Sequence, residues 1–494
     1  MCGDYGQPSD SNVVPITKPR MRPPRSFAVL ASLALAACAT AKPDVRLPAA
    51  YEAPASAAPA GSVALDRWWL NFNDAELTGL IDQALVANPD AKTAAARLRE
   101  VRAQRIGAIL QYTPQGDASF SGRKTNTTQL SGTVANIPGF SNSGTSEAYS
   151  GQFNVSWEVD LFGRAFAATR AANAEVAAAR FDYEGTRASL AADVADSYFQ
   201  ARGLAIQLAD ARETARIQRN LYDVATKRAE VGIAATSDAD RVAGDLSQAD
   251  AQVAALEAQL QVERRALLIL TGRIVEPTAN IAVAPDVGQP PAIPQTIPGD
   301  LLARRPDVRQ ARARLASAFG QQDTAALAFL PTLQFTPGLG YSRIIQPGFK
   351  SETQNWSWGG SITQPVLSIP RLIADLKTQK ARTDQAVFAY EKAVQTAFQE
   401  SESALVNLDA DKRRVALLTD GEARAARSYK ASRMGYDRGL NDLQTTLSAE
   451  QSWRATRAQL TAAQVQALRR SVQAYKALGG GWQAQDFPTD RQAR

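Results

Sequence analysis

The sequence predicts an internally duplicated α+β membrane protein, in which each half combines a pair of membrane strands with long coiled-coil helices. Three observations predict this class: a repeat of the half-molecule, short segments that alternate apolar and polar residues, and long alanine-rich segments without proline. After residue 40 the sequence has no apolar run long enough for a transmembrane helix. A membrane crossing by this chain therefore requires strands.

The half-molecule repeats at two offsets. Asn88–Asp90 and Arg305–Asp307 open similar helix patterns, and we call the step from Asn88 to Arg305 the longer offset. Further on, the step from Arg164 to Arg371 relates the copies, and we call it the shorter offset, because the first copy is ten residues longer between Pro114 and Arg164. A unit of this size is much longer than the repeat of a solenoid. The duplication instead predicts pseudo-equivalent copies that take neighbouring places around an axis.

These repeats predict the domain organisation of the chain. Each repeat contains a membrane hairpin, at about 115–162 and 332–368, followed by a helical hairpin, at about 164–271 and 371–478. The expected divisions are a signal peptide (1–37), an acylated N-terminal tether (38–65), repeat 1 (66–273), an inter-repeat linker (274–299), repeat 2 (300–482) and a C-terminal tail (483–494). Within the tether, residues 42–61 are rich in Pro, Ala and Ser, which predicts an extended segment and not a packed element.

Strand patterns occur in pairs, one pair per repeat. Residues 118–121, 151–159, 333–342 and 356–363 alternate apolar and polar side chains with period two, and each strand is expected to be about ten residues long. Polar, glycine-containing loops are expected at Thr125–Gly144 and Ile344–Thr353. A hairpin pair on the surface of a soluble domain is the alternative, although the bulky aromatic face lacks a second sheet to cover it. Four strands cannot close a barrel, and lipid does not tolerate an open edge, whereas three chains would supply twelve strands.

Long helix patterns lie between the strand pairs. Arg164–Val231 contains no proline and predicts a rod of about 100 Å, followed by a return helix about half as long. Repeat 2 has the same pattern in Arg371–Arg438 and Asn441–Leu478. The helices at 88–112 and 305–329 are expected to stack end to end with the return helices. A heptad seam within the first rod comprises Leu190, Val194, Ser197, Ala201, Leu204, Leu208, Ala211 and Ala215.

Composition argues against several classes of function. The chain has no histidine and two cysteines, Cys2 and Cys38, which removes the usual nitrogen ligands of zinc and the commonest general base. The net charge of +6 comes with basic residues spread along the helices, which indicates solvated faces and no nucleic-acid surface. We find no pairing of nucleophile and base, no metal-ligand cluster and no phosphate-binding glycine loop. The sequence therefore predicts no catalytic residue, no metal and no enzyme activity.

The N-terminal segment predicts export and lipid attachment. A basic region at 18–25 precedes the short apolar run Phe27–Ala34 and then Leu35–Cys38, which resembles the lipobox of bacterial lipoproteins. Cleavage before Cys38 would leave its thiol to carry the lipid, the one covalent group expected on this chain. The alternative is an ordinary signal peptide cut after Ala41, with Cys38 discarded. Residues before Met21 lack signal character, so Met21 is an alternative start.

Several motifs resemble one family. Asp66–Trp69, with Ala87–Asp90 further on, resembles the opening of mature TolC-type outer-membrane efflux proteins. Trp157–Arg164 resembles the strand-to-helix junction of their lipoprotein branch, the OprM-like and NodT-like proteins, and Gln364–Arg371 resembles the second junction. Leu270–Gly272 resembles the end of the first repeat.

The resemblance implies a homotrimer, in which a twelve-stranded β-barrel in the outer membrane continues as a twelve-helix α-barrel through the periplasm, with a mixed equatorial domain around its middle. It implies a passive exit duct for small molecules, served by a periplasmic adaptor and an inner-membrane pump of the resistance-nodulation-division type. The expected location is the bacterial outer membrane, with a lipid anchor. A periplasmic coiled-coil lipoprotein scaffold or adaptor is the alternative function.

The resemblance also places a periplasmic gate at the helix tips. It puts the tip turns at Gly232 and Gly439, where the chain reverses between helices. In the family a tyrosine just before the second tip bonds to a polar pair just after the first, which here are Tyr436 and Ser237-Asp238. The alternative for Asp238 is a cap on the returning helix, because Ser and Asp commonly cap helices.

The charged half of this lock departs from the family pattern. The family places an arginine two residues after the second tip glycine, and Asn441 stands there in this chain. Arg438 or Arg433 is the nearby cation that would substitute for it.

Four residues are expected to shape the strand–helix junctions. Gly163 and Pro370 occupy nearly the same place in the repeats, where glycine supplies unusual dihedral angles and proline fixes the entry angle of a helix. Arg164 and Arg371 follow them in the first helical turn, which the helix dipole disfavours. These arginines are expected to face lipid headgroups or an acidic neighbour, or to be solvated.

Overall fold

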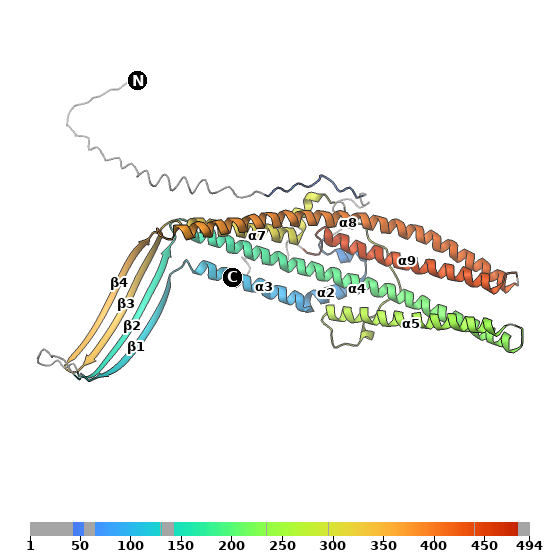
Figure 1. The fold of residues 1–494 in the computed structure, drawn as a ribbon, viewed down its shortest axis with the longest axis horizontal. Coiled ribbons are helices and arrows are strands. Elements are labelled where there is room, and N and C mark those ends of the chain that lie inside the picture. The colour runs from blue at the N-terminus through green and yellow to red at the C-terminus, as the bar shows by residue number, and fades with distance from the viewer. Residues whose placement is uncertain are drawn as a thin grey trace, which may run out of the picture. The chain divides into compact units, whose positions relative to one another are not determined.

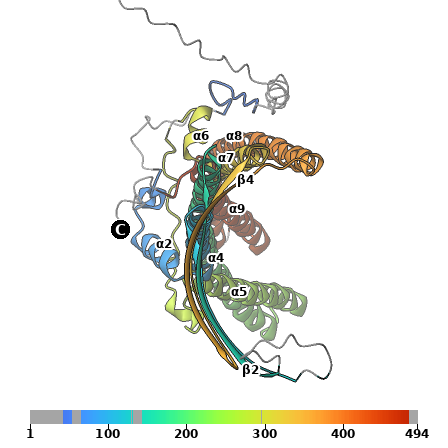
Figure 2. The ribbon, with the colours of Figure 1, turned by 90° about the vertical axis from the view of Figure 1, so that its left-hand side faces the viewer.

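The computed structural model describes residues 43–53, 65–128, 130, 143–233, 235–294, 296–438 and 440–482. Within these residues the chain forms a curved antiparallel sheet joined to long helical hairpins (Figures 1 and 2). No helix in these ranges is both long enough and apolar enough to cross a membrane. Gate and junction residues lie at the ends of these elements, so the bounds of the elements decide the geometry of the candidate site.

The sheet of the described residues contains four strands in the order of the chain. They are β1 (Gln115–Thr127), β2 (Gly144–Val159), β3 (Thr332–Gln346) and β4 (Phe349–Thr363), with β2 paired to β3 across the repeats. They are 13 to 16 residues long, so the expected length of about ten was too short. The apolar alternation marked only the middle of each strand, while hydrogen-bonded pairing continues through the polar ends.

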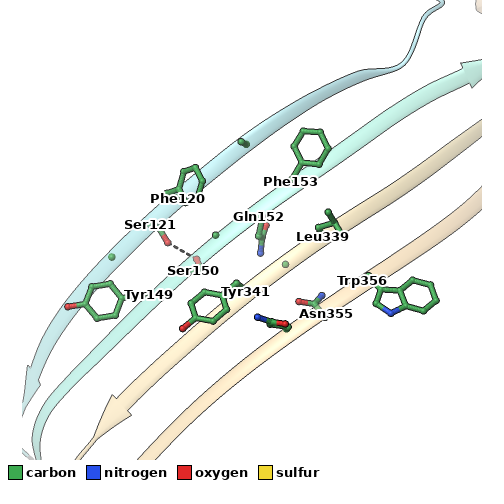
Figure 3. A pocket seen from close by; sticks show the side chains of 15 residues that line it. Phe120, Ser121, Tyr149, Ser150, Gln152, Phe153, Leu339, Tyr341, Asn355 and Trp356 are labelled. Atoms are coloured by element: carbon green, nitrogen blue, oxygen red, sulfur yellow. Dashed lines mark hydrogen bonds between the residues drawn. The ribbon is translucent and has the colours of Figure 1, made fainter.

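Strand register separates the side chains of the sheet into two faces. Phe153 pairs with Leu339, and Leu339 pairs with Trp356, so these apolar side chains share one face. Figure 3 shows them around a hollow of the sheet with Phe120 and Tyr149. Ser121 and Ser150 pair on the other face, where their hydroxyls lie 2.8 Å apart. The sheet is therefore apolar on one side and polar on the other, as a barrel wall between lipid and water requires.

The turn of the second hairpin is tighter than expected. The sequence predicts a loop at Ile344–Thr353, but strands β3 and β4 extend to Gln346 and Phe349, which pair with each other. Pro347 and Gly348 form the turn, and Gly348 has a φ of 79°. Proline followed by a residue with positive φ is the signature of a type II turn, so the polar flanking residues belong to the ladder. The loop of the first hairpin lies largely outside the described residues.

The helical hairpins repeat with the same bounds, except that the second long helix begins two residues earlier than its counterpart. Helix α4 (Arg164–Glu230) and helix α5 (Thr236–Leu270) form the first, and α8 (Ile369–Asp437) and α9 (Leu443–Ala477) form the second. Applying the shorter offset to α5 gives the bounds of α9 at both ends. Helix α4 has 67 residues, about 100 Å at 1.5 Å per residue. Of its predicted heptad seam, the described structure buries six residues fully and Ser197 and Ala211 only in part.

Shorter helices continue the return helices end to end. Helix α3 (Pro89–Leu110) and helix α7 (Pro306–Leu327) are related by the longer offset, and α2 (Ala75–Ala87) precedes α3. The Asn88 side chain caps α3 and donates from its Nδ2 to the carbonyl of Leu270, the last residue of α5, at 3.0 Å. The Arg305 guanidinium donates to the carbonyl of Ala477 at 3.0 Å. Each joint thus satisfies a carbonyl that the helix end leaves unpaired.

The core of the chain lies around the middle of the helices. Trp68, in the short helix η1 (Trp68–Phe72), is fully buried and stacks on Tyr475 with ring centroids 5.7 Å apart. Arg202 of α4 is also buried, and its guanidinium donates to the Asp74 carboxylate at 2.5 Å. The remaining short elements are η2 (Thr278–Asn280), η3 (Pro298–Asp300) and α6 (Leu301–Arg304). Because the buried Ile281 and Ile293 belong to the predicted linker, that linker is part of the core.

The described part of the tether, residues 43–53, is packed and not merely extended. Its backbone N–H groups at Asp44 and Ala53 each donate at 2.7 Å to carboxylates of α8, Glu391 and Glu402 respectively. Tyr51 stacks on Phe398 with ring centroids 6.0 Å apart. The expectation of an unpacked tether is therefore wrong for this stretch, because acidic side chains of the distant helix α8 accept its backbone N–H groups.

Candidate functional site at the helix tips and strand–helix junctions

The first helix tip is a glycine turn. Helix α4 ends at Glu230, and Gly232 follows with a φ of 73°. The N–H of Ile233 donates to the carbonyl of Arg228 at 2.9 Å, which closes the helix end in the manner of a Schellman motif. A side chain at position 232 would be strained in this conformation, so the predicted tip turn has a physical need for glycine. In Figure 1 this tip and the tip of the second hairpin lie at the end away from the strands.

Ser237 and Asp238 are exposed in the first turn of α5. The N-cap of α5 is Ala235, which has no capping hydrogen bond from a side chain. The alternative prediction, that Asp238 caps this helix, is therefore wrong. Its carboxylate instead stands at the positive end of the helix dipole, exposed to solvent.

The second tip is fastened within its own hairpin. The Asn441 side chain donates from Nδ2 to the carbonyl of Ser432 at 3.2 Å, and its backbone N–H donates to the carbonyl of Gly435 at 3.4 Å. Asp442 caps α9 by accepting from the N–H of Thr445 at 2.7 Å. Hydrogen bonds from the hydroxyl and N–H of Thr445 lower the pKa of the Asp442 carboxyl. Sequence reasoning missed this cap, although Asp is a preferred residue directly before a helix.

The other gate residues are only partly described. Tyr436 belongs to the last turn of α8, but its side chain and all of Gly439 lie outside the described residues. Arg438 is exposed directly after the helix, where its N–H donates to the carbonyl of Met434 at 3.3 Å. Cys38 also lies outside the described residues. Ser237 and Asp238 belong to the first hairpin, whereas Arg438 belongs to the second. A contact between them would therefore connect two hairpins.

The first strand–helix junction is built on Asp160. Its carboxylate accepts the N–H groups of Gly163, Arg164 and Ala165 at 2.8 to 2.9 Å. Gly163 has a φ of 83°, which turns the chain from β2 into α4. Burial alone would raise the pKa of Asp160, but these backbone hydrogen bonds lower it below its ordinary value. Sequence reasoning missed Asp160, whose position three residues before a helix-opening glycine was the available signal.

Arginines at both junctions contact acidic side chains. Arg164 donates to Glu158 at 3.1 Å, and Arg371 donates to Asp375 at 3.2 Å one helical turn ahead. At the second junction β4 ends at Thr363 and α8 begins at Ile369, which places Pro370 in the first turn. The expected hairpin limit of 368 and helix start of 371 are thus displaced, because Pro365 cannot donate to a ladder and Pro370 is tolerated where N–H groups are unpaired.

The described residues position the helix ends and the faces of the sheet, and they form no catalytic group. Across the described ranges, no group of three or more His, Cys, Asp or Glu side chains lies close enough to hold a metal ion. Polar side chains line one face of the sheet, and exposed charged residues mark the opposite end of the helices. The geometry of the sheet fits a wall between lipid and water.

Comparisons with known proteins agree with this arrangement. A family model described as outer membrane efflux protein matches residues 80–273 and 297–480, one match in each repeat. The chain is 30% identical over 475 residues to the pyoverdine export outer membrane protein OpmQ of Pseudomonas putida, covering 94% of this chain and 99% of that protein. It is 29% identical to the outer membrane protein OprJ of Pseudomonas aeruginosa, covering 92% of this chain and 95% of that one.

Solved structures give the same result. The outer-membrane channel OprN superposes with a TM-score of 0.74 at 28% identity, covering 90% of this chain and all of the OprN chain. CusC, described in terms of transmembrane channel formation, superposes with a TM-score of 0.74 at 25% identity, covering 90% of this chain and all of that chain.

Proposed function

The chain belongs to the outer membrane efflux protein family, and from that premise we propose the details of how it works as an exit duct. It is an outer-membrane channel of a tripartite efflux pump and not an enzyme. The protomers form a trimer with a twelve-stranded β-barrel and a twelve-helix α-barrel, and the partners are a periplasmic adaptor and an inner-membrane pump. The alternative of a periplasmic scaffold is thereby set aside.

The open sheet carries this conclusion. All residues of β1 are exposed, and β1 and β4 end the sheet of the described residues. Unpaired strand edges are not tolerated in hydrocarbon, so copies of the chain must supply the missing partners. The polar face then lines an aqueous lumen and the aromatic face meets lipid.

We propose that the cargo is a small molecule and that the pump is of the resistance-nodulation-division type. Relatives are named for export of pyoverdine and efflux of toluene, both small molecules. The duct supplies no energy, because the mechanism needs only a lined passage and an end that opens. A test is dye efflux from cells that lack their own channel but hold an adaptor and pump of this type. Restored efflux supports the pairing, and failure with correctly inserted trimer contradicts it.

We propose that Cys38 carries the lipid and that the lipid is an anchor additional to the barrel. The order of basic, apolar and small residues before Cys38 supports this assignment. Mass spectrometry of the mature N-terminal peptide is expected to find an acylated Cys38. The Cys38→Ala variant is expected to lose the acyl mass and still need detergent for extraction. A peptide that begins after Ala41 would overturn the lipid assignment.

We propose that Asp238 and Tyr436 form the polar contact that holds the periplasmic end closed, with Arg438 as the accompanying cation. The exposure of Asp238 at the first tip supports this role, and so does the engagement of Asn441 within its own turn. A charge-assisted hydrogen bond contributes about 1.5–3 kcal/mol. Three copies around the axis would hold the end closed until the adaptor binds.

Single-channel conductance in a planar bilayer tests the duct and the gate together. Wild-type protein is expected to give a small, mostly closed conductance that rises in Asp238→Ala and in Tyr436→Phe. Asp240→Ala, which removes an exposed carboxylate from the same end of α5, serves as the matched control. A pore that neither substitution changes would keep the duct and discard the gate. Absence of conductance from correctly trimeric protein would contradict the duct itself.

A further inference from the structure

The membrane strands carry few charged residues, and the strand register assigns each of them to one face of the sheet. Alternate residues of a strand point to opposite faces, so the register decides whether a charge meets lipid or the lumen. The charged residues between Gln115 and Val159 and between Thr332 and Thr363 are Asp117, Arg123, Lys124, Glu147, Glu158, Arg343, Lys350 and Glu352.

On the aromatic face the charged side chains lie near the hairpin turns and neutralise one another. Lys124 lies opposite Glu147 in the ladder, and their side chains form an ion pair at 2.8 Å. The carboxylate of Glu352 lies 3.1 Å from the Nζ of Lys350 and 3.4 Å from the Nε of Arg343. Each cation on this face therefore has a carboxylate beside it, which lowers the cost of placing it next to lipid.

On the polar face one cation stands alone. Glu158, at the end of β2, pairs with Arg164 of the strand–helix junction at 3.1 Å. Arg123 is exposed and lies opposite Ala148, and it makes no ion pair with any described residue. Asp117 lies on the same face but six residues away along β1, which is about 20 Å. Arg123 is therefore an isolated cation on the face that lines the lumen.

Closure of the barrel brings no carboxylate to Arg123. The sequence between β1 and β2, residues 128–143, contains no charged residue. The other open edge of the sheet is β4, whose charged residues Lys350 and Glu352 both belong to the aromatic face. The polar face of β4 is thus uncharged along its whole length, whichever of its residues lies opposite Arg123. The cation stays unpaired in the closed ring.

We propose that the three copies of Arg123 form a cationic ring near the extracellular mouth and give the exit a preference for small anionic solutes. Arg123 lies in the last third of β1, towards the hairpin turns, and in Figure 1 these turns lie at the end of the strands away from the helices. A guanidinium group presents a planar fork of donors that matches a carboxylate or a phosphate. The inference rests on the proposed duct and adds the residue that sets the charge of the solutes it passes best.

The dimensions of the barrel let such a ring act on every solute that passes. Three four-stranded protomers supply strands about 4.8 Å apart, and a tilt of about 40° places the wall about 12 Å from the axis. The Debye length is about 10 Å at 0.1 M salt and about 3 Å at 1 M. A solute on the axis therefore meets the field of the guanidinium groups in dilute salt, and concentrated salt screens that field.

Asp117 supplies the opposite charge deeper in the lumen. Its carboxylate is exposed and makes no ion pair with any described residue. The separation of about 20 Å along β1 exceeds the Debye length at 0.1 M salt, so the ring of Asp117 and the ring of Arg123 act on a solute one after the other. Removal of the Asp117 charge is therefore expected to change ion preference in the opposite direction from removal of the Arg123 charge.

Reversal potentials in a planar bilayer test the ring. Under a KCl gradient at or below about 0.1 M, Arg123→Gln is expected to lower the permeability ratio of chloride to potassium about two- to fivefold. Arg123→Lys keeps the charge and is expected to keep the wild-type ratio, and Asp117→Asn is expected to raise it. Lys124→Gln is the matched control, because it removes a cation at the adjacent position from the aromatic face. All differences are expected to shrink at about 1 M salt.

The background for these measurements leaves the charge of the duct unchanged. Openings of the wild-type channel are used first, and the series is repeated with Tyr436→Phe, which alters no charge at the helix tips. Asp238→Ala is avoided here because it removes a carboxylate from the conducting path. A gate proposal that fails therefore leaves the selectivity of wild-type openings as a separate result.

Block by a polyanion gives a second, independent measurement. Inorganic tripolyphosphate on the extracellular side is expected to reduce the current through wild type and Arg123→Lys, and to leave the current through Arg123→Gln unchanged. A ratio and a block that Arg123→Gln does not alter would reject the ring and keep the duct. Equal shifts in Arg123→Gln and Lys124→Gln would also overturn it. Absence of conductance from every correctly trimeric variant and from wild type would contradict the duct and the ring together.

Discussion

The repeats are alike along their helices and differ where each helix begins and turns. Helices α5 and α9 coincide at both ends under the shorter offset, and α3 and α7 coincide under the longer one. At the strand–helix junctions, repeat 1 uses Asp160 and Gly163 whereas repeat 2 uses Pro370. At the tips, the N-cap of α5 is Ala235, which makes no capping hydrogen bond from its side chain, whereas Asp442 caps α9. The lengths of these helices are thus the same in both copies, whereas the residues at the helix ends differ.

This difference locates where the copies have acquired separate roles. Helices that build a ring must keep one spacing, so their lengths and small residues are constrained by both neighbours. Helix ends face solvent, lipid headgroups or a partner, so they can change without disturbing the ring. Because equivalent positions differ in chemistry, each repeat supplies the matched control for a substitution in the other.

The largest effect is expected from the buried ion pair of repeat 1. Arg202→Met leaves the carboxylate of Asp74 buried without its cation, which costs about 3–5 kcal/mol. The position equivalent to Arg202 in repeat 2 is Asp409, which pairs with the exposed Arg413 at 3.0 Å. Arg413→Met is expected to cost less than about 1 kcal/mol. Urea unfolding of the detergent-purified trimers measures both losses of unfolding free energy. Equal losses would contradict the prediction that this ion pair stabilises repeat 1 more than its counterpart stabilises repeat 2.

A smaller loss is expected at the glycines that end the return helices. Gly272 and Gly479 have φ of 73° and 79°, where alanine costs about 1–2 kcal/mol. A Cβ at Gly479 would lie 2.9 Å from the carbonyl carbon of Arg304, whereas one at Gly272 would lie 3.0 Å from the Cβ of Ala87. Gly479→Ala is therefore expected to lower Tm more than Gly272→Ala. Gly421→Ala in α8, which meets only ordinary contacts, is the control, and a loss there as large would reject this explanation.

Glu184 is expected to make the stability of repeat 1 depend on pH near neutrality. Burial raises the pKa of its carboxyl to about 7 despite Arg180, Arg309 and Arg187 nearby. The folded state then binds the proton more tightly than the unfolded chain, so stability falls as pH rises from about 4.5 to about 7. Glu184→Gln is expected to flatten this decline in Tm. Glu391, the equivalent residue, accepts an N–H from the tether, and Glu391→Gln is expected to leave the decline in place.

The smallest effect is expected at the first junction. Asp160→Ala removes the acceptor for three backbone N–H groups and is expected to cost about 0.5–2 kcal/mol. The folded-state pKa of Asp160 is lowered, so this contribution is present above a pH of about 4 and is lost as pH falls through the folded pKa. Tm at pH 7 should therefore separate wild type from Asp160→Ala, and acid should bring the two together. Leu367→Ala, at the equivalent position, is the control and should show no convergence.

Much of this architecture is legible in the sequence. Alternating residues such as Phe153 and Val155 mark the strands, Arg164 and Arg371 mark the repeat, and Gly232 marks a tip that needs a positive φ. These signals are local: each depends on the periodicity of one element or on the backbone conformation of one residue. The described ends of α4 and α5 fall within one residue of the expected bounds for the same reason.

The tertiary structure alone decided what occupies the ends of these elements. The tether packs because Glu391 and Glu402 on a distant helix accept its N–H groups, which no pattern within residues 43–53 encodes. The Asn441 side chain is held within its own hairpin because its Nδ2 donates to the carbonyl oxygen of Ser432 at 3.2 Å. The periodicity of a segment determines whether it forms a helix or a strand, because it reflects which face of the segment is buried. Acceptors and cations brought from remote segments depend on packing, so only the folded chain determines them.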